Sequence, residues 1–284
     1  MTTYGFVQVD VFTRSPLAGN PVAVVLDAEG IDAGDMQRLA AWTNLSETAF
    51  VLPPTQAGAD YRLRIFTPAH ELRFAGHPTV GAAHAVLEAG SVRGDAAHLT
   101  QECGAGLLAL RTEGSGPERR IFVRVPEAKV LRDRAVDVDA LGRALGAPVV
   151  AVPPPLVIDV GPVWLVAQIA EEKVLRSLAP DMAALAALSR DGGVTLFALG
   201  SVTGADVTVR SFAPAGGIPE DPVCGSGNIC VAAYLRHFGR AQGAYVARQG
   251  MQLGRDGRVS MRVSAEAIEL GGRAVTVLRG DLVV

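Results

Sequence analysis

The chain has 284 residues, which is enough for two domains, because domains cluster near about 100–150 residues. Hydrophobic residues make up 49% of the sequence and charged residues 19%, a composition that describes a globular protein and excludes a disordered or fibrous one. The formal charge of -3 gives no reason to expect a nucleic acid as a partner.

The N-terminus and the cysteines predict a cytoplasmic protein. MTTYGFVQVDVF has no cationic stretch before an uninterrupted apolar one, so it does not resemble a signal peptide. The most apolar region, residues 149–170, contains several prolines and Asp159, which a membrane helix rarely carries, so no membrane span is predicted. Cys103, Cys224 and Cys230 are too few for a disulfide framework and fit a reducing compartment.

The first half is predicted to alternate strands with helices. A helix over 32–43 would have Asp32 as its N-cap, and a second helix over 78–90 would end at Gly90 as its C-cap. Glu47 lies at a loop-to-strand junction, where functional side chains are common. The first helix is expected to bury Met36, Leu39, Ala40 and Trp42 on one face. Strands are predicted at 4–12, 22–26, 49–54, 61–68, 99–112 and 119–128.

The second half repeats this order in outline. After a strand come a helix beginning near Asp181, two further strands, a loop at 215–224 and a helix that ends at Gly239. Short strands are expected toward the C-terminus. The predicted strands are 161–170, 193–199, 205–214, 244–253, 258–263, 267–270 and 274–278.

A self-similarity links the two halves. The segment RIFTPA (64–69) matches RSFAPA (210–215) at Arg, Phe, Pro and Ala. Each segment is followed by a loop and then by a glycine that opens an alanine-rich stretch, GHPTVGAAHAVLEAG in the first copy and GSGNICVAAYLRHFG in the second. Two copies separated by about half the chain predict two similar domains rather than a solenoid.

Two helix starts that follow glycine suggest binding of a carboxylate. The starts are Gly76-His77 and Gly225-Ser226, and a helix N-terminus offers unpaired N–H groups and a partial positive charge. The alternative is that each glycine only relieves crowding. If both helix starts face a cleft, two or three donors would orient a small acid.

Titratable residues near these loops suit proton transfer, for which groups with a pKa near ambient pH are needed. They are Glu47, His77, Glu220, Asp221 and Cys224. Metal and cofactor sites are not expected: the HELRF stretch (70–74) lacks the second histidine of a zinc-protease helix, and the cysteines lack zinc-finger spacing. Phosphate-loop, dinucleotide and nucleophile-elbow patterns are also missing from the sequence.

Four blocks in register resemble the phenazine-biosynthesis isomerase (PhzF-like) family, which is related in fold to diaminopimelate epimerase and proline racemase. The blocks are PLAGNPVAVV, NLSETAFVLPP, RIFTP with ELRFAGHPTVGAAH, and RSFAP with EDPVCGSGN. The resemblance implies an α/β (α+β) fold of two pseudo-symmetric domains, each a β-sheet barrel around a central helix. It places residues 1–118 plus 273–284 in the first domain and 119–272 in the second.

The family resemblance also implies cofactor-independent isomerisation by proton transfer, on a small carboxylic acid bound in the interdomain cleft. Glu47 would be the general acid and base, with His77, Asp221 and Ser226 as polar partners. Gly76, Gly225 and Asn20 would bind the substrate. The likeness further implies a homodimer.

Cys224 departs from the resemblance. The epimerase relatives pair two cysteines, one before each helix start, whereas this chain has Ala75 and Cys224 in those places. A thiol at a helix N-terminus is expected to have a lowered pKa, so an epimerase or racemase that uses Cys224 with Glu47 is an alternative. Cys224 as a small apolar filler, and a small-acid-binding protein without turnover, are further alternatives.

Overall fold

The computed structural model describes residues 1–92, 97–189, 192–200 and 204–284. The chain divides into two compact units. Unit one contains Met1–Arg124 and Gly271–Val284, and unit two contains Val125–Leu270. Across the described ranges, every helix is too short or too polar to cross a membrane.

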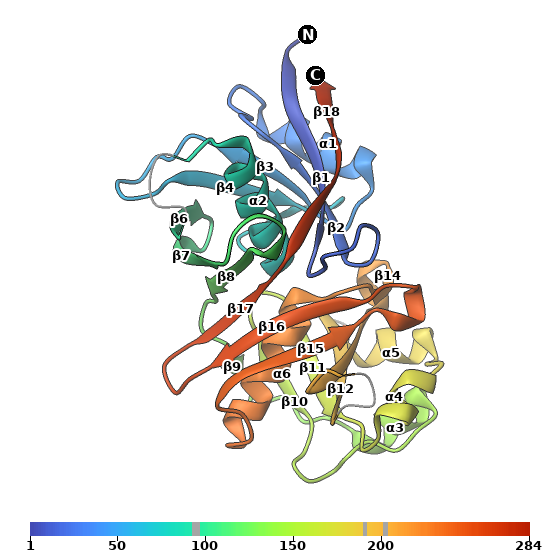
Figure 1. The fold of residues 1–284 in the computed structure, drawn as a ribbon. Coiled ribbons are helices and arrows are strands. Elements are labelled where there is room, and N and C mark those ends of the chain that lie inside the picture. The colour runs from blue at the N-terminus through green and yellow to red at the C-terminus, as the bar shows by residue number, and fades with distance from the viewer. Residues whose placement is uncertain (93–96, 190–191, 201–203) are drawn as a thin grey trace. The chain divides into compact units, whose positions relative to one another are not determined.

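Unit one is built from strands around one buried helix (Figure 1). Helix α2 (Gly76–Ala89) is buried over residues 76–86, and strands of this unit pack against it. Its C-cap is Gly90 in the left-handed conformation, as predicted. The other elements are β1 (Thr3–Val11), β2 (Asn20–Val25), α1 (Ala33–Thr43), β3 (Thr48–Leu52), β4 (Tyr61–Phe66), β5 (Glu71–Leu72), β6 (His98–Cys103), β7 (Gly106–Glu113), η1 (Gly116–Glu118), β8 (Arg120–Arg124) and β18 (Ala274–Val283).

The chain returns to unit one at its end. Strand β18 runs antiparallel to β1, from Thr3 opposite Val283 to Val11 opposite Ala274. In Figure 1 the red last strand accordingly lies along the blue first strand. The strand is longer than the predicted 274–278.

Helix α1 confirms the predicted cap but corrects the predicted face. The Asp32 side chain accepts a hydrogen bond from the Asp35 N–H, so it caps α1 as expected. Met36 and Ala40 are buried in a core with Phe50 and other residues of unit one. Trp42, which was assigned to the apolar face, is 81% exposed, because it lies two residues beyond Ala40 and therefore on another side of the helix.

Unit two places its strands between two layers of helix. Alternate residues of β12 point to opposite faces: Val194, Leu196 and Ala198 share a core with helices α3, α4 and α5, while Phe197 stacks edge-on against Tyr234 of α6. The elements are β9 (Lys129–Val130), α3 (Val138–Leu145), β10 (Leu156–Asp159), β11 (Val163–Gln168), α4 (Glu172–Ser177), α5 (Met182–Leu188), β12 (Gly192–Leu199), β13 (Val207–Ala213), η2 (Pro214–Gly216), β14 (Ile218–Asp221), α6 (Gly225–His237), β15 (Gly243–Gln249), η3 (Met251–Leu253), β16 (Gly257–Val263) and β17 (Ile268–Gly272), which continues into unit one.

Two predicted segments have a finer structure. The strand expected at 99–112 is a hairpin of β6 and β7, with Cys103 opposite Gly106 at its turn. The loop expected at 215–224 contains η2 and β14, which pairs with β13. This segment contains two prolines and two glycines. These residues favour loops, so the sequence pattern did not predict the short strand.

The strand pairings of the two units match one by one. β1–β2 and β10–β11 are antiparallel, β2–β3 and β11–β12 are parallel, and β3–β4 and β12–β13 are antiparallel. Strands β4 and β13 then each pair with a short antiparallel strand and with a parallel one, β5 and β6 in unit one and β14 and β15 in unit two. The repeated RIFTPA and RSFAPA segments fall on β4 and β13.

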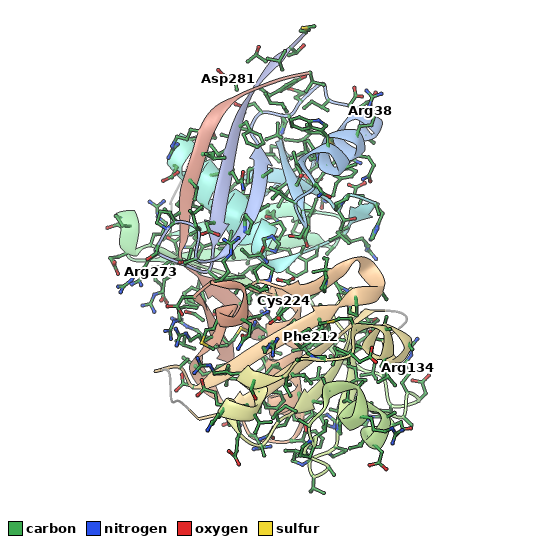
Figure 2. All side chains as sticks on the ribbon, turned by 90° about the vertical axis from the view of Figure 1, so that its right-hand side faces the viewer. Arg38, Arg134, Phe212, Cys224, Arg273 and Asp281 are labelled. Carbon is green, nitrogen blue, oxygen red and sulfur yellow. The ribbon has the colours of Figure 1, made fainter. Side chains whose placement is uncertain are left out.

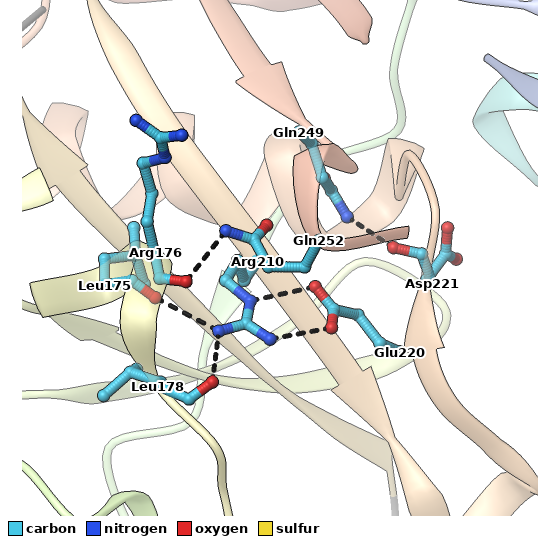
Figure 3. Close-up of polar contacts among 8 residues, drawn as sticks. All are labelled: Leu175, Arg176, Leu178, Arg210, Glu220, Asp221, Gln249 and Gln252. Atoms are coloured by element: carbon cyan, nitrogen blue, oxygen red, sulfur yellow. Dashed lines mark hydrogen bonds and ion pairs between the residues drawn. The ribbon is translucent and has the colours of Figure 1, made fainter. Parts of the chain in front are cut away.

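An ion pair is repeated with these strands. Arg64 of β4 donates two hydrogen bonds of 2.7 Å to Glu71 of β5, and Arg210 of β13 donates bonds of 2.9 and 2.8 Å to Glu220 of β14. In unit two the arginine also donates to the carbonyls of Leu175 and Leu178 (Figure 3). The planar guanidinium suits such two-pronged contacts, and these fix the short strand ahead of each helix start.

Candidate functional site

In unit one, Glu47 and His77 lie side by side. Glu47 stands between α1, whose C-cap Asn44 is in the left-handed conformation, and the first residue of β3. His77 is the second residue of α2. The Nε2 atom of His77 is 3.5 Å from Oε2 of Glu47, and their side chains are 5% and 16% exposed. The expected general acid and base, Glu47, and its polar partner His77 are therefore neighbours that are largely shielded from water.

Burial brings the pKa of the Glu47 carboxyl close to neutral pH, which suits proton transfer. Desolvation raises its pKa from 4.5 to about 7, although a hydrogen bond with Ser46 opposes the shift. A carboxyl with this pKa is partly protonated and partly ionised near neutral pH. It can therefore both accept and donate a proton there.

The start of α2 beside this pair has no side-chain cap among the residues that the structure describes. Its N-cap is Ala75, whose methyl group offers no acceptor, and the Thr79 N–H is bonded to the Ala75 carbonyl. Gly76 and His77 are both buried. A helix N-terminus with this arrangement favours an anion through its N–H groups and its dipole.

Asn20, the third residue assigned to substrate binding, opens β2 opposite Val11 of β1. It is 1% exposed. The neighbouring Gly19 N–H donates to Oδ2 of Asp10, also buried. A side chain at Gly19 would lie 2.2 Å from the Val11 carbonyl oxygen, so this turn requires glycine.

In unit two the matching helix start is capped. The Cys224 Sγ accepts a hydrogen bond of 3.2 Å from the Gly227 N–H at the start of α6, and it lies 3.5 Å from Oγ of Ser226. An added Cβ at Gly227 would come within 2.6 Å of the hydroxyls of Ser211 and Thr195. The close approach of backbone to these hydroxyls therefore depends on glycine.

The pKa of Cys224 moves opposite to the expected direction. Burial raises it well above the ordinary value, and the negative charge of Asp221 raises it further. The contacts with the Ser226 hydroxyl and the Gly227 N–H act in the lowering direction but are smaller causes. The expected lowering at a helix N-terminus is thus overridden, and the residue is a neutral thiol at neutral pH.

Buried amides hold the segment that joins Asp221 to Cys224. Gln249 Nε2 donates to the Asp221 carbonyl at 2.9 Å (Figure 3). Asn228 Nδ2 donates to the Cys224 carbonyl at 2.8 Å and to Oε1 of Gln249 at 2.9 Å. Asn228 and Gln249 are at most 1% exposed, so the turn between the two proposed site residues is fixed from inside the unit. Cys224 and the core residue Phe212 of the same unit can be located in Figure 2.

Ser226 has a partner that sequence reasoning missed. The indole Nε1 of Trp164, in β11, donates a hydrogen bond of 3.0 Å to Ser226 Oγ. Trp164 is 5% exposed, whereas Ser226 keeps partial exposure. The sequence marked Trp164 only as part of an apolar strand, and its distance of 62 residues from Ser226 left no local signal of the contact.

The structure thus gathers the candidate residues in two groups. Unit one holds Glu47, His77 and Gly76 at the start of α2, with Asn20 at the start of β2. Unit two holds Asp221, Cys224, Gly225 and Ser226 at the start of α6. Each group joins a helix start to polar side chains.

Several known proteins are similar to this chain in sequence and in fold. The chain is 40% identical to antisense-enhancing sequence 1 of Schizosaccharomyces pombe, over 99% of each chain. It is 34% identical to trans-2,3-dihydro-3-hydroxyanthranilate isomerase of Pseudomonas chlororaphis, over 98% of this chain and 99% of that one.

Solved structures agree with the sequence matches. The phenazine biosynthesis protein, PhzF family, of Bacillus anthracis matches all of both chains with a TM-score of 0.86 at 27% identity. A probable proline racemase of Agrobacterium radiobacter matches 99% of this chain and 92% of its own, with a TM-score of 0.68 at 15% identity, and so shares the fold. Residues 9–280 match the family described as phenazine biosynthesis-like protein (PhzC-PhzF). The chain therefore belongs to the PhzC-PhzF family and is an isomerase of that family.

Proposed function

We propose that this isomerase moves a proton between two carbon atoms of a small carboxylic acid, and that Glu47 carries the proton. The observation that carries the proposal is the buried Glu47 carboxyl, with its pKa raised to about 7 and its Oε2 atom 3.5 Å from His77. General acid and base catalysis works best with a group whose pKa lies near the working pH.

The reaction needs no other proton donor. The Glu47 carboxylic acid gives its proton to one carbon of the substrate, and the resulting carboxylate takes a proton from another carbon of the same molecule. The substrate is isomerised without loss or gain of atoms, and Glu47 returns to its starting form. His77, whose Nε2 atom lies 3.5 Å from Oε2 of Glu47, assists this transfer as a polar neighbour of the carboxyl group.

The similarity to trans-2,3-dihydro-3-hydroxyanthranilate isomerase supports a substrate of this class. We propose an acid in which a double bond or an adjacent polar group makes a C–H bond acidic. The uncapped start of α2 suits the carboxylate. The proposal further requires that Asp221 and Ser226 act on the same substrate as Glu47. Substitutions of Asp221 and Ser226 test this requirement, because each is then expected to weaken the affinity for a ligand.

The epimerase alternative has less support. A two-base epimerase needs Cys224 to ionise easily, but burial and Asp221 raise the pKa of this thiol well above its ordinary value. Its sulfur also accepts a hydrogen bond from the Gly227 N–H as the cap of α6. A thiol in this place caps the helix and fills the core.

The experiment is deuterium exchange. The chain is incubated in D2O with a panel of small unsaturated and amino acids, and deuterium bound to carbon is measured by mass spectrometry. The expected result is that the wild-type chain labels a member of the panel, that Glu47→Gln does not, and that Glu29→Gln does. Glu29 is exposed and lies outside the site, so it controls for loss of one charge.

Either of two results overturns the proposal. One is exchange by Glu47→Gln at the wild-type rate. The other is labelling that stops in Cys224→Ser while it continues in Glu47→Gln, which would move the proton to the thiol. Circular dichroism of each variant verifies that it is folded.

A further inference from the structure

The matched strand pairings identify the residue of unit two that takes the place of Glu47. Thr48 is the partner of Phe66 in unit one, and Val194 is the partner of Phe212 in unit two. Phe66 and Phe212 are the matched residues of the repeated segments. Thr48 therefore corresponds to Val194, and the residue before each is Glu47 in unit one and Gly193 in unit two.

Trp164 fills the space beside Gly193. The two residues are partners in the parallel pairing of β11 with β12. A Cβ added at Gly193 would lie 2.3 Å from Cζ3 and 2.7 Å from Cε3 of the Trp164 ring, as well as 2.7 Å from the Phe212 carbonyl oxygen. Such distances exclude any side chain at residue 193 while the indole is in place.

The indole also makes the contact that corresponds to the Glu47–His77 pair. His77 and Ser226 are each the second residue of the matched helices α2 and α6. In unit one Glu47 meets His77 at 3.5 Å. In unit two the Nε1 atom of Trp164 meets Ser226 Oγ at 3.0 Å. A titratable side chain is thus replaced by one that cannot exchange protons at neutral pH.

We propose that Trp164 is a positioning residue for Ser226, and that the Ser226 hydroxyl of unit two binds an oxygen atom of the substrate. The indole N–H can only donate, so Ser226 Oγ accepts this bond. The neutral Cys224 thiol, 3.5 Å from Ser226 Oγ, can be the donor in their contact, which leaves the Ser226 proton for another partner. The partly exposed hydroxyl then donates to an acceptor atom of the ligand, a carboxylate or carbonyl oxygen. The inference rests on the proposed function, in which unit one moves the proton and offers the start of α2 to a carboxylate, and it adds a hydrogen-bond donor from unit two for another oxygen of the ligand.

A first measurement tests the hydrogen bond by itself. The chain has two tryptophans, and Trp42 is exposed, so Trp42→Phe leaves Trp164 as the sole indole fluorophore. In this background Ser226→Ala is expected to shift the emission of Trp164, since the partner of its N–H is lost. Cys230→Ala, a change elsewhere in α6, is the matched control and is expected to leave the emission unchanged. An unchanged emission in Ser226→Ala overturns the contact.

A second measurement tests the role in binding. Anthranilate, a stable aromatic carboxylate, is the probe, and its affinity is measured by calorimetry for the wild type, Trp164→Phe, Ser226→Ala and the double variant. Loss of one hydrogen bond predicts affinity about fivefold weaker in each single variant. If Trp164 acts through Ser226, the double variant is expected to bind no more weakly than Ser226→Ala alone.

The outcomes separate the inference from the proposed function. Any of three results would overturn the role of Trp164. The double variant could lose affinity by the product of the two single losses, Trp164→Phe could bind with wild-type affinity, or the wild type could fail to bind anthranilate. Steady-state exchange supplies an independent readout: Trp164→Phe is expected to raise KM and to leave kcat within about twofold, because uniform binding affects KM alone. Failure of the proposed function instead appears as continued exchange by Glu47→Gln. Thermal unfolding of each variant shows whether its core is intact.

Discussion

Oε2 of Glu47 and Nε2 of His77 lie 3.5 Å apart, with both side chains largely shielded from water. The surroundings raise the pKa of the glutamate rather than lower it, because desolvation is the largest cause of the shift. The protein thus maintains a carboxyl group that is costly to ionise. This cost has measurable consequences for stability as well as for catalysis.

Glu47→Gln is expected to change how stability depends on pH. The folded-state pKa of about 7 exceeds the ordinary value of 4.5, so the stability that Glu47 contributes is fully present below pH 4.5 and is lost as the pH rises through 7. The loss amounts to about 3 kcal/mol. Relative to the wild type, the variant should therefore gain about 3 kcal/mol in free energy of unfolding between pH 4.5 and pH 8.

Urea unfolding of both proteins at several pH values measures this difference. Glu29→Gln serves as the control, because it removes one carboxyl group from an exposed side chain. A difference between wild type and Glu47→Gln that stays constant from pH 4.5 to 8 would show that Glu47 titrates normally.

The repeated ion pairs are expected to contribute unequally to stability. Arg210 and Glu220 are 5% and 8% exposed, whereas Arg64 and Glu71 are 27% and 42% exposed. Glu220→Gln leaves a buried guanidinium without its charge partner and is expected to cost about 3–5 kcal/mol. Glu71→Gln, the matched substitution in unit one, is expected to cost less than about 1 kcal/mol.

Chemical denaturation of the two glutamine variants makes the comparison. Because Glu220 adjoins Asp221, its loss should also weaken anthranilate binding in any variant that still folds. Equal destabilisation by the two substitutions would contradict the argument from burial.

Cys224 is expected to react slowly with iodoacetamide. It is 2% exposed, and its pKa is raised well above the ordinary value, while alkylation requires the thiolate. At pH 8 its labelling should be slower than that of a free thiol by more than about tenfold. Peptide mass spectrometry of timed samples gives the rate. If Cys224 were labelled rapidly at pH 8 and a carboxylate ligand blocked the labelling, Cys224 would again be a candidate for carrying the proton.

Gly227→Ala is expected to destabilise unit two although alanine favours helices. The new methyl group would lie 2.6 Å from the hydroxyls of Ser211 and Thr195, and crowding of a packed core costs about 1–3 kcal/mol. Gly216→Ala is the matched control, because its Cβ would meet nothing within 4 Å. Thermal unfolding compares the two. Equal melting temperatures would show that the start of α6 can relax without loss.

Local signals in the sequence predicted much of the fold. Asp32 and Gly90 take their predicted capping roles because a cap depends on a few neighbouring residues. The repeated RIFTPA and RSFAPA segments lie on strands with matching partners. The exposure of Trp42 and the short strand β14 were not predicted, since they depend on helix orientation and on pairing with β13.

The sequence predicted the proximity of two candidate residues but not the electrostatics of the candidate site. Glu47 and His77 were grouped by family resemblance, and the structure brings them within contact. The direction of the Cys224 pKa was wrong, because burial and Asp221 outweigh the helix N-terminus. Trp164 was missed, because its contact with Ser226 joins residues far apart in the chain.

The pairing of β18 with β1 has a consequence for biosynthesis. Strand β2 pairs with one edge of β1, whereas the other edge finds its antiparallel partner in residues 274–283, which are synthesised long after β1. Until then the first unit exposes one bare edge of backbone N–H and C=O groups, a template for pairing with other chains. Nascent chains that stall or terminate before residue 274 should therefore aggregate through β1 even when unit two is complete.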